Sequence, residues 1–171
     1  AAATGIMTTD TLPKGASRQF VIDGVTVTVT GISKGAGMIR PNMATMPGYI
    51  ATDAKVAPAV LKDLILAGAN KSFNRITIAG DTSPNDCCML IATGQANVPA
   101  VTEAKGPLFE ALKQAVFEVC MEVAKAIVRA GEGATKFVTG EGNGGGNNHD
   151  CTDVGLAAAH SPMTKTSPFA P

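Results

Sequence analysis

The stretch Phe20-Val21-Ile22-Asp23-Gly24-Val25-Thr26-Val27-Thr28-Val29-Thr30 decides the fold. Asp23-Gly24 is a residue pair typical of a type I′ turn, and valine and threonine alternate with a period of two after it. The valines therefore share one face of an extended chain and the threonines share the other. This pattern predicts an antiparallel β-hairpin.

The residues after the hairpin predict a shaped loop and then a helix. Three glycines and a proline interrupt residues 31–41, and an apolar stretch covers Tyr49 to Thr52. Apolar residues then recur at helical spacing from about Pro58 to Ala69. Thr52-Asp53 supplies residue types that cap helix N-termini, so we expect the cap there.

Further along, two short strands and a long helix are expected. The strands cover Arg75 to Ile78 and Cys88 to Ala92, and the helix has Pro107 near its first turn and Gly131 as its C-cap. One face of this helix is apolar and carries Leu108, Leu112, Ala115, Val116, Val119, Val123 and Ile127.

The last part of the chain has a different composition. Gly140 to Asp150 is rich in glycine and asparagine, which predicts a flexible loop or a disordered insert, and Leu156 to Ala159 fits a short helix. The order of all these elements predicts an α+β fold of layered sheets and helices.

Composition narrows the function classes. The 171 residues are 45% hydrophobic, which is enough for a core, and 14 Lys and Arg balance 14 Asp and Glu. A net charge of zero gives no basic surface for nucleic acid or anionic membranes. No apolar run approaches the roughly 18 residues of a membrane span, and no signal peptide opens the chain. We expect a cytoplasmic protein with neither a nucleic-acid nor a membrane partner.

The cysteine pattern indicates neither a disulfide framework nor a metal centre. Four cysteines occur without a C-x-x-C pair, which is typical of free, mostly buried thiols in a reducing compartment. His149, Cys151 and His160 lack the spacing of a structural zinc site. We expect no metal and no bound cofactor.

The most informative block runs from Lys34 to Thr45 and reads Lys-Gly-Ala-Gly-Met-Ile-Arg-Pro-Asn-Met-Ala-Thr. It resembles the autoprocessing segment of the glutamate N-acetyltransferase/ornithine acetyltransferase family of arginine biosynthesis, and the chain resembles the central part of that family. Further blocks match in the same order: Met7-Thr-Thr-Asp-Thr-x-Pro-Lys14, Ser72-Phe-Asn-Arg-Ile-Thr77, Gly80-Asp-Thr-Ser-x-Asn-Asp86, Gly131-Glu-Gly-Ala-Thr-Lys136 and Ser161-Pro-x-x-Lys-Thr166.

The resemblance implies self-cleavage between Ala44 and Thr45, followed by catalysis at Thr45. The freed α-amine of Thr45 has an ordinary pKa of about 7.7–8.0, so it can serve as the base for the neighbouring hydroxyl. In the family, this threonine takes an acetyl group from N-acetylornithine and passes it to glutamate. Acetyl-CoA is a further possible acetyl donor.

The resemblance also assigns substrate contacts to Thr8, Lys34 and Glu132, in addition to Thr45. An ammonium at Lys34 suits a carboxylate or an oxyanion, and a carboxylate at Glu132 suits the amine of a substrate. The alternatives are a solvated lysine, an ordinary charge at a helix end and a threonine at a strand edge.

The family further implies a DmpA-like, N-terminal-nucleophile fold built from two chains of one precursor. Residues 1–44 correspond to the C-terminal end of the α chain, and residues 45–171 to the N-terminal part of the β chain. The two share one domain, and a heterotetramer of two α and two β chains is expected.

Several positions depart from the family pattern. Pro47 replaces a leucine and removes a backbone donor from the strand expected to carry Thr45, while Ala79 and Pro84 alter the polar turn. The upstream oxyanion-hole residues and a downstream asparagine of the family are absent. Two alternatives stay open: a related N-terminal-nucleophile aminopeptidase or amidase, and an inactive truncated fragment.

Overall fold

The computed structural model describes residues 1–37, 39, 47–80 and 87–169. Its elements in chain order are α1 (Ala2–Gly5), β1 (Lys14–Ile22), β2 (Val25–Ser33), β3 (Gly48–Thr52), α2 (Pro58–Lys71), the 3₁₀ turn η1 (Phe73–Arg75), β4 (Cys88–Ala92), α3 (Pro107–Arg129), α4 (Asn148–His160), α5 (Pro162–Thr166) and the 3₁₀ turn η2 (Ser167–Phe169). The α+β class expected from the sequence is confirmed.

The predicted hairpin is the first half of a four-stranded sheet with the order β1-β2-β3-β4. Asp23 and Gly24 have φ values of 49° and 76°, the left-handed region that a type I′ turn requires at both positions. β1 pairs with β2 and β2 with β3 in antiparallel fashion, whereas β3 and β4 are parallel. The strand β4 confirms the expectation for Cys88–Ala92.

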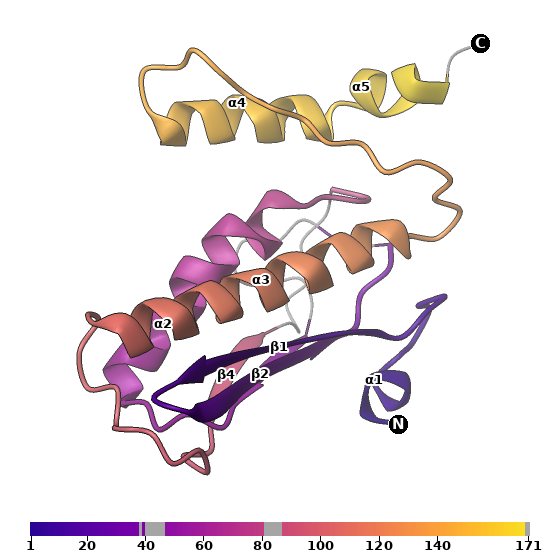
Figure 1. The fold of residues 1–171 in the computed structure, drawn as a ribbon. Coiled ribbons are helices and arrows are strands. Elements are labelled where there is room, and N and C mark those ends of the chain that lie inside the picture. The colour runs from indigo at the N-terminus through magenta and orange to yellow at the C-terminus, as the bar shows by residue number, and fades with distance from the viewer. Residues whose placement is uncertain (38, 40–46, 81–86, 170–171) are drawn as a thin grey trace.

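The core lies between one face of the sheet and two helices. Figure 1 shows α2 and α3 on the same side of the sheet, with α4 and α5 beyond them. Val27 and Val29 of β2 and Ile50 of β3 are fully buried, as are Leu112 and Val119 of α3. The apolar stripe predicted for the long helix is therefore the face that packs on the sheet.

The helix α2 starts later than the predicted cap. Its N-cap is Ala57, and Pro58 occupies the first turn, where its missing N–H costs nothing. The Oδ1 atom of Asp53 instead accepts a hydrogen bond of 2.8 Å from the backbone N–H of Thr28. The expectation of a Thr52-Asp53 cap was wrong because this side chain fastens β2 to the end of β3.

The strand expected over Arg75–Ile78 is also absent. Phe73–Arg75 forms η1, and Ile78 donates its N–H to the carbonyl of Ile39 at 2.9 Å. The backbone of this segment is thus hydrogen-bonded to a loop rather than to a neighbouring strand. Its apolar side chains pack against the core, although the segment forms no β-ladder.

The C-cap of α3 is Ala130 rather than Gly131, with an ordinary φ of −94°. Ala130 and Gly131 donate to the carbonyls of Ile127 and Val128, at 3.2 and 3.3 Å. These i→i+3 bonds tighten the last turn, so no left-handed glycine is required at this position.

The glycine-rich stretch has no regular structure up to Gly146, but α4 begins inside the predicted loop. The side chain of Asn147 accepts from the N–H groups of His149 and Asp150 at 2.8 and 3.0 Å. This cap starts a helix that runs to His160 and includes the short helix expected over Leu156–Ala159. Across the described residues, no helix has the length and hydropathy of a membrane span.

All four cysteines are free, as expected, but only Cys120 is fully buried. Burial raises the pKa of Cys120 to about 12 and that of Cys88 to about 11. These two thiols stay protonated near neutral pH and are poor nucleophiles.

The core is tightly packed around Gly31 of β2. A Cβ atom there would lie 2.6 Å from the Cδ1 atom of Ile50 and 2.6 Å from the Cγ1 atom of Val119. We expect Gly31→Ala to lower the free energy of unfolding by about 1–3 kcal/mol, the usual effect of overpacking a core. Urea unfolding measures it.

Gly5→Ala is the matched control, because nothing lies within 4 Å of its Cβ position. An unchanged unfolding midpoint for Gly31→Ala would show that Ile50 and Val119 move aside without cost.

Candidate functional site

Thr8 and Lys34, two of the described residues that the sequence assigns to a site, lie at one end of the sheet. Lys14 at the start of β1 pairs with Ser33 at the end of β2, and Ser33 pairs with Gly48 at the start of β3. Gly48 in turn pairs with Cys88 at the start of β4. We call this end of the sheet, where these four residues lie, the site end. The loops that carry Thr8 and Lys34 both leave the sheet here.

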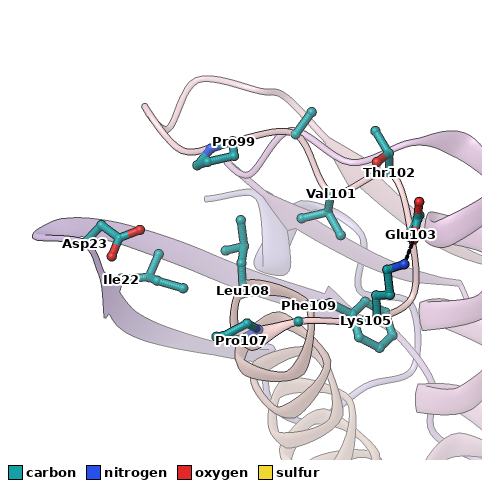
Figure 2. Close-up of a pocket in the computed structure, with 12 residues that line it drawn as sticks. Ile22, Asp23, Pro99, Val101, Thr102, Glu103, Lys105, Pro107, Leu108 and Phe109 are labelled. Carbon is teal, nitrogen blue, oxygen red and sulfur yellow. Dashed lines mark ion pairs between the residues drawn. The ribbon is translucent and has the colours of Figure 1, made fainter.

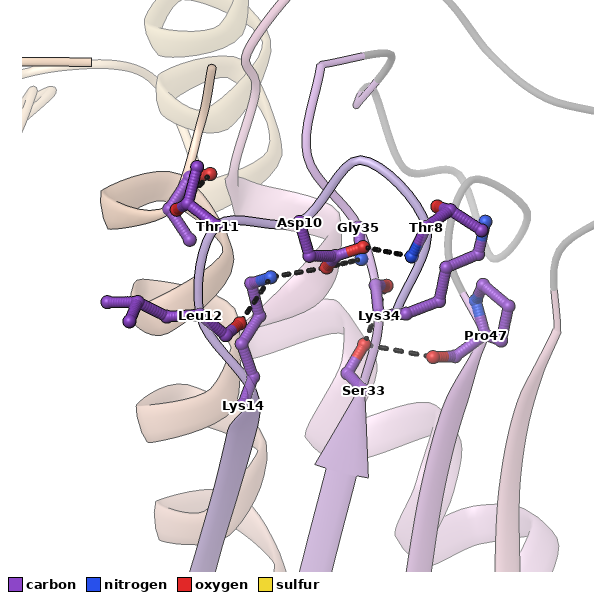
Figure 3. A network of polar contacts seen from close by, with 10 residues as sticks. Thr8, Asp10, Thr11, Leu12, Lys14, Ser33, Lys34, Gly35 and Pro47 are labelled. Atoms are coloured by element: carbon purple, nitrogen blue, oxygen red, sulfur yellow. Dashed lines mark hydrogen bonds and ion pairs between the residues drawn. The ribbon is translucent and has the colours of Figure 1, made fainter. Parts of the chain in front are cut away.

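A buried ion pair between Asp10 and Lys14 organises this end (Figure 3). Their side chains are 0% and 1% exposed. Asp10 also accepts backbone hydrogen bonds from Gly35, at 2.7 Å to Oδ1, and from Thr8, at 3.1 Å to Oδ2. The ammonium of Lys14 donates to the carbonyl of Leu12 at 3.3 Å. One carboxylate therefore joins the loop before β1 to the loop after β2.

This environment keeps Asp10 ionised. Burial alone would raise the pKa of its carboxyl group, but the hydrogen bond from Lys14 and the N–H groups of Gly35 and Thr8 outweigh it and lower the pKa from 3.8 to about 2. The carboxylate can thus accept bonds at both oxygens throughout the neutral range.

Lys34 lies directly beside the entry to β3. Its backbone N–H donates to the carbonyl of Pro47 at 3.2 Å, and the hydroxyl of Ser33 donates to the same oxygen at 2.9 Å. Pro47 takes part only through its carbonyl, so its missing N–H leaves these contacts intact. The strand β3 forms from the next residue on.

Glu132 approaches the same loop from the end of α3. Its Oε2 atom lies 3.7 Å from the position that a Cβ atom on Gly37 would take. The carbonyl of Gly37 accepts from the N–H of Ala79 at 2.9 Å, so the backbone of Ala79 holds the loop in place. The loop from Lys34 to Gly37 therefore contacts the Asp10 network at Gly35 and lies next to Glu132 at Gly37.

The structure thus brings together three of the residues expected at a site. Thr8 and Glu132 are exposed and Lys34 is half-buried, as substrate contacts need to be. Ala44, Thr45 and Pro84 lie outside the described residues. Sequence reasoning assigned no role to Asp10 and Lys14, although an acid and a base four residues apart in a matching block were a signal.

A cavity of about 430 Å³ lies at the opposite end of the hairpin (Figure 2). It is lined by the turn residues Ile22 and Asp23 and by the start of α3, including Leu108 and Phe109. A nine-residue strand spans roughly 30 Å, so this cavity is remote from the site end. Of the described residues expected at the site, none lines it.

Metal ligands do not cluster in the part of the chain that the structure describes. No group of three or more His, Cys, Asp or Glu side chains there is arranged to hold an ion. The polar groups of the site end are instead suited to charged organic molecules: an ammonium, a carboxylate and a hydroxyl around one loop.

Fold and site together define an α+β protein whose loops gather complementary charges at one end of a mixed sheet. The chain belongs to the ArgJ family, whose model matches residues 1–171. It is 80% identical over 170 residues to the arginine biosynthesis bifunctional protein ArgJ of Pseudomonas syringae pv. tomato and 76% identical to that of Pseudomonas fluorescens.

These alignments cover 99% of this chain and 42% of each relative, so the chain spans less than half of their length. The crystal structure of the arginine biosynthesis bifunctional protein ArgJ from Bacillus halodurans has a similar fold. It is 34% identical, with a TM-score of 0.62 over 71% of this chain and 56% of that one. The family resemblance read from the sequence blocks is confirmed.

The depressed pKa of Asp10 predicts a specific acid sensitivity. Because the pKa falls from 3.8 to about 2 on folding, the stabilisation from this carboxylate is complete above pH 3.8 and is lost as the pH falls through 2. Urea unfolding between pH 5 and pH 2 should show a steeper loss of stability for the native sequence than for Asp10→Asn, which has no carboxyl group there. Equal slopes would contradict the ion-paired state.

Proposed function

We propose that the protein to which this chain belongs transfers an acetyl group from N-acetylornithine to glutamate through Thr45. Family membership supports the reaction class. The observation that carries the proposal is the gathering of Thr8, Lys34 and Glu132 around one loop that is hydrogen-bonded to Pro47. Thr45 precedes Pro47 by two residues, and two peptide units span about 7 Å at most.

The first step in this proposal is cleavage of the Ala44–Thr45 bond. The hydroxyl of Thr45 attacks the carbonyl carbon of Ala44, and the acyl group moves from nitrogen to oxygen. Water then hydrolyses the ester, which leaves a carboxylate on Ala44 and a free amine on Thr45. That amine takes the hydroxyl proton in each later attack.

Transfer then proceeds in two halves. The Thr45 oxygen attacks the acetyl carbonyl of N-acetylornithine, and ornithine leaves with the proton. The α-amine of glutamate attacks the acetyl-threonine ester, which yields N-acetylglutamate and restores the hydroxyl. Lys34 pairs with a substrate carboxylate and Glu132 with a substrate amine, whereas Thr8 offers a hydroxyl. The cycle uses no metal or bound cofactor, and acetyl-CoA is an alternative acetyl donor.

The sheet supports the two-chain part of this proposal, because it would hold the two chains together after cleavage. Residues 1–44 contain β1 and β2, residues 45–171 contain β3 and β4, and β2 pairs with β3 from Val29–Thr52 to Ser33–Gly48. Cutting between Ala44 and Thr45 leaves this ladder and the shared core in place. We further propose that the two chains stay together as an αβ pair, and that two such pairs assemble into a heterotetramer in the cytoplasm.

Self-cleavage is tested on the full-length protein by intact-mass analysis and N-terminal sequencing. The new N-terminus should read Thr45-Met46-Pro47-Gly48, and Thr45→Ala should leave one uncut chain without acetyl transfer. An uncut native protein would support the inactive alternative. Acetate released without N-acetylglutamate would support a hydrolase of the amidase type.

Lys34→Met and Glu132→Gln should each lower kcat/KM for acetyl transfer about 10- to 100-fold, the usual range for losing one charged hydrogen bond of about 1.5–3 kcal/mol. Steady-state kinetics with both amino-acid substrates measures it. Lys105→Met and Glu103→Gln are matched controls, because they remove the partners of an exposed ion pair by the remote cavity. An unchanged kcat/KM in Lys34→Met and Glu132→Gln would show that Lys34 and Glu132 are ordinary surface charges.

A further inference from the structure

We propose that Asp10, held in place by Lys14, is the positioning residue of the substrate site. Its carboxylate fixes the backbone at Thr8 and at Gly35, next to Lys34, and so sets the separation of two substrate contacts. This inference rests on the proposed function for its kinetic consequence, but its structural part can be measured without any activity.

The two oxygens of Asp10 hold different segments. Oδ1 accepts from Gly35, in the loop after β2, and Oδ2 accepts from Thr8, in the loop before β1 (Figure 3). These segments share no ladder, since the β1–β2 pairing begins only at Lys14 and Ser33. The carboxylate therefore links two loops that lie beyond the end of the sheet and are not joined by a β-ladder.

The burial of this ion pair has a large cost in free energy. Removing two charges from water costs several kcal/mol per ion. Apolar side chains of similar size would fill the same space without that cost. Asp10 compensates part of that cost by accepting two backbone hydrogen bonds, a buried one from Gly35 and a partly buried one from Thr8. Gly35 is buried and has a φ of 153°, a value that glycine adopts freely. Because glycine has this conformational freedom, the hydrogen bond to Asp10 is what restrains its backbone.

The anchor also reaches the segment that leads into β3. Gly35 follows Lys34, whose N–H donates to the carbonyl of Pro47. A shift at Gly35 would therefore change the Lys34–Pro47 hydrogen bond, two residues from the proposed nucleophile. Since the Asp10 side chain is 0% exposed, it cannot touch a substrate and acts only through these neighbours.

The test separates positioning from stability with two variants of the full-length protein. Asp10→Asn leaves Lys14 buried without a counter-charge and should destabilise the fold. Asp10→Asn combined with Lys14→Met removes both charges, so stability should recover toward the native value. An amide accepts hydrogen bonds only at its oxygen, so in both variants the N–H of either Thr8 or Gly35 loses its acceptor.

We expect KM for the amino-acid substrates to rise in both variants, with kcat/KM about 100-fold lower, the scale of a 1 Å misplacement. Amide hydrogen exchange should accelerate at Thr8 or Gly35, while Ile50 and Val119 stay protected in the double variant. Glu122→Gln is the control. It breaks an exposed ion pair with Arg18 and should change neither measurement.

A double variant with native KM and native exchange at both Thr8 and Gly35 would overturn the inference and leave Asp10 a purely structural residue. Absence of acetyl transfer in the native protein is a different result, because it contradicts the proposed function. The exchange rates at Thr8 and Gly35 would then decide the positioning role on their own.

Discussion

The structure depends on the position of β2, which is hydrogen-bonded on both edges and packed under α3. Val27 and Val29 fill the face toward the helix, and Gly31 carries no side chain because Ile50 and Val119 occupy that space. A one-residue slip in this strand would turn the valines to the open face and set threonines against α3. The strand ends at Ser33, so its register also determines where Lys34 and the loop beyond it emerge.

This arrangement separates the chemistry from the core. The apolar contacts lie along the strands and between the helices, whereas Thr8, Lys34 and Glu132 lie in loops at the site end. Those loops are held by polar contacts to their backbone: Asp10 accepts from Gly35, Lys34 donates to Pro47 and Ala79 donates to Gly37. Because each contact uses the backbone of the held residue, side chains such as Lys34 and Thr8 stay available for a ligand.

The sequence predicted the elements with strong local signals and missed those set by tertiary contacts. Asp23-Gly24 fixed the hairpin and the spacing of Leu112, Val119 and Ile127 fixed the buried face of α3, since turn chemistry and helical period act locally. The segment near Ile78 looked like a strand because burial produces the same apolar pattern, while its backbone partner, Ile39, is far away in sequence. The sequence blocks located Thr8, Lys34 and Glu132 by resemblance, but the spacing alone did not show that Glu132 meets the loop at Gly37.

The buried ion pair explains why a site built on loops can still be precise. A loop anchored only by apolar packing can slide, because dispersion contacts have little directional preference, whereas a carboxylate that accepts along two oxygens fixes both distance and angle. Lys14 belongs to β1 and is thus part of the rigid sheet, so the chain of contacts runs from the core through Lys14 and Asp10 to Thr8 and Gly35. The Asp10–Lys14 pair thus connects the sheet to both loops, and the backbone hydrogen bonds that Asp10 accepts offset part of the cost of its burial.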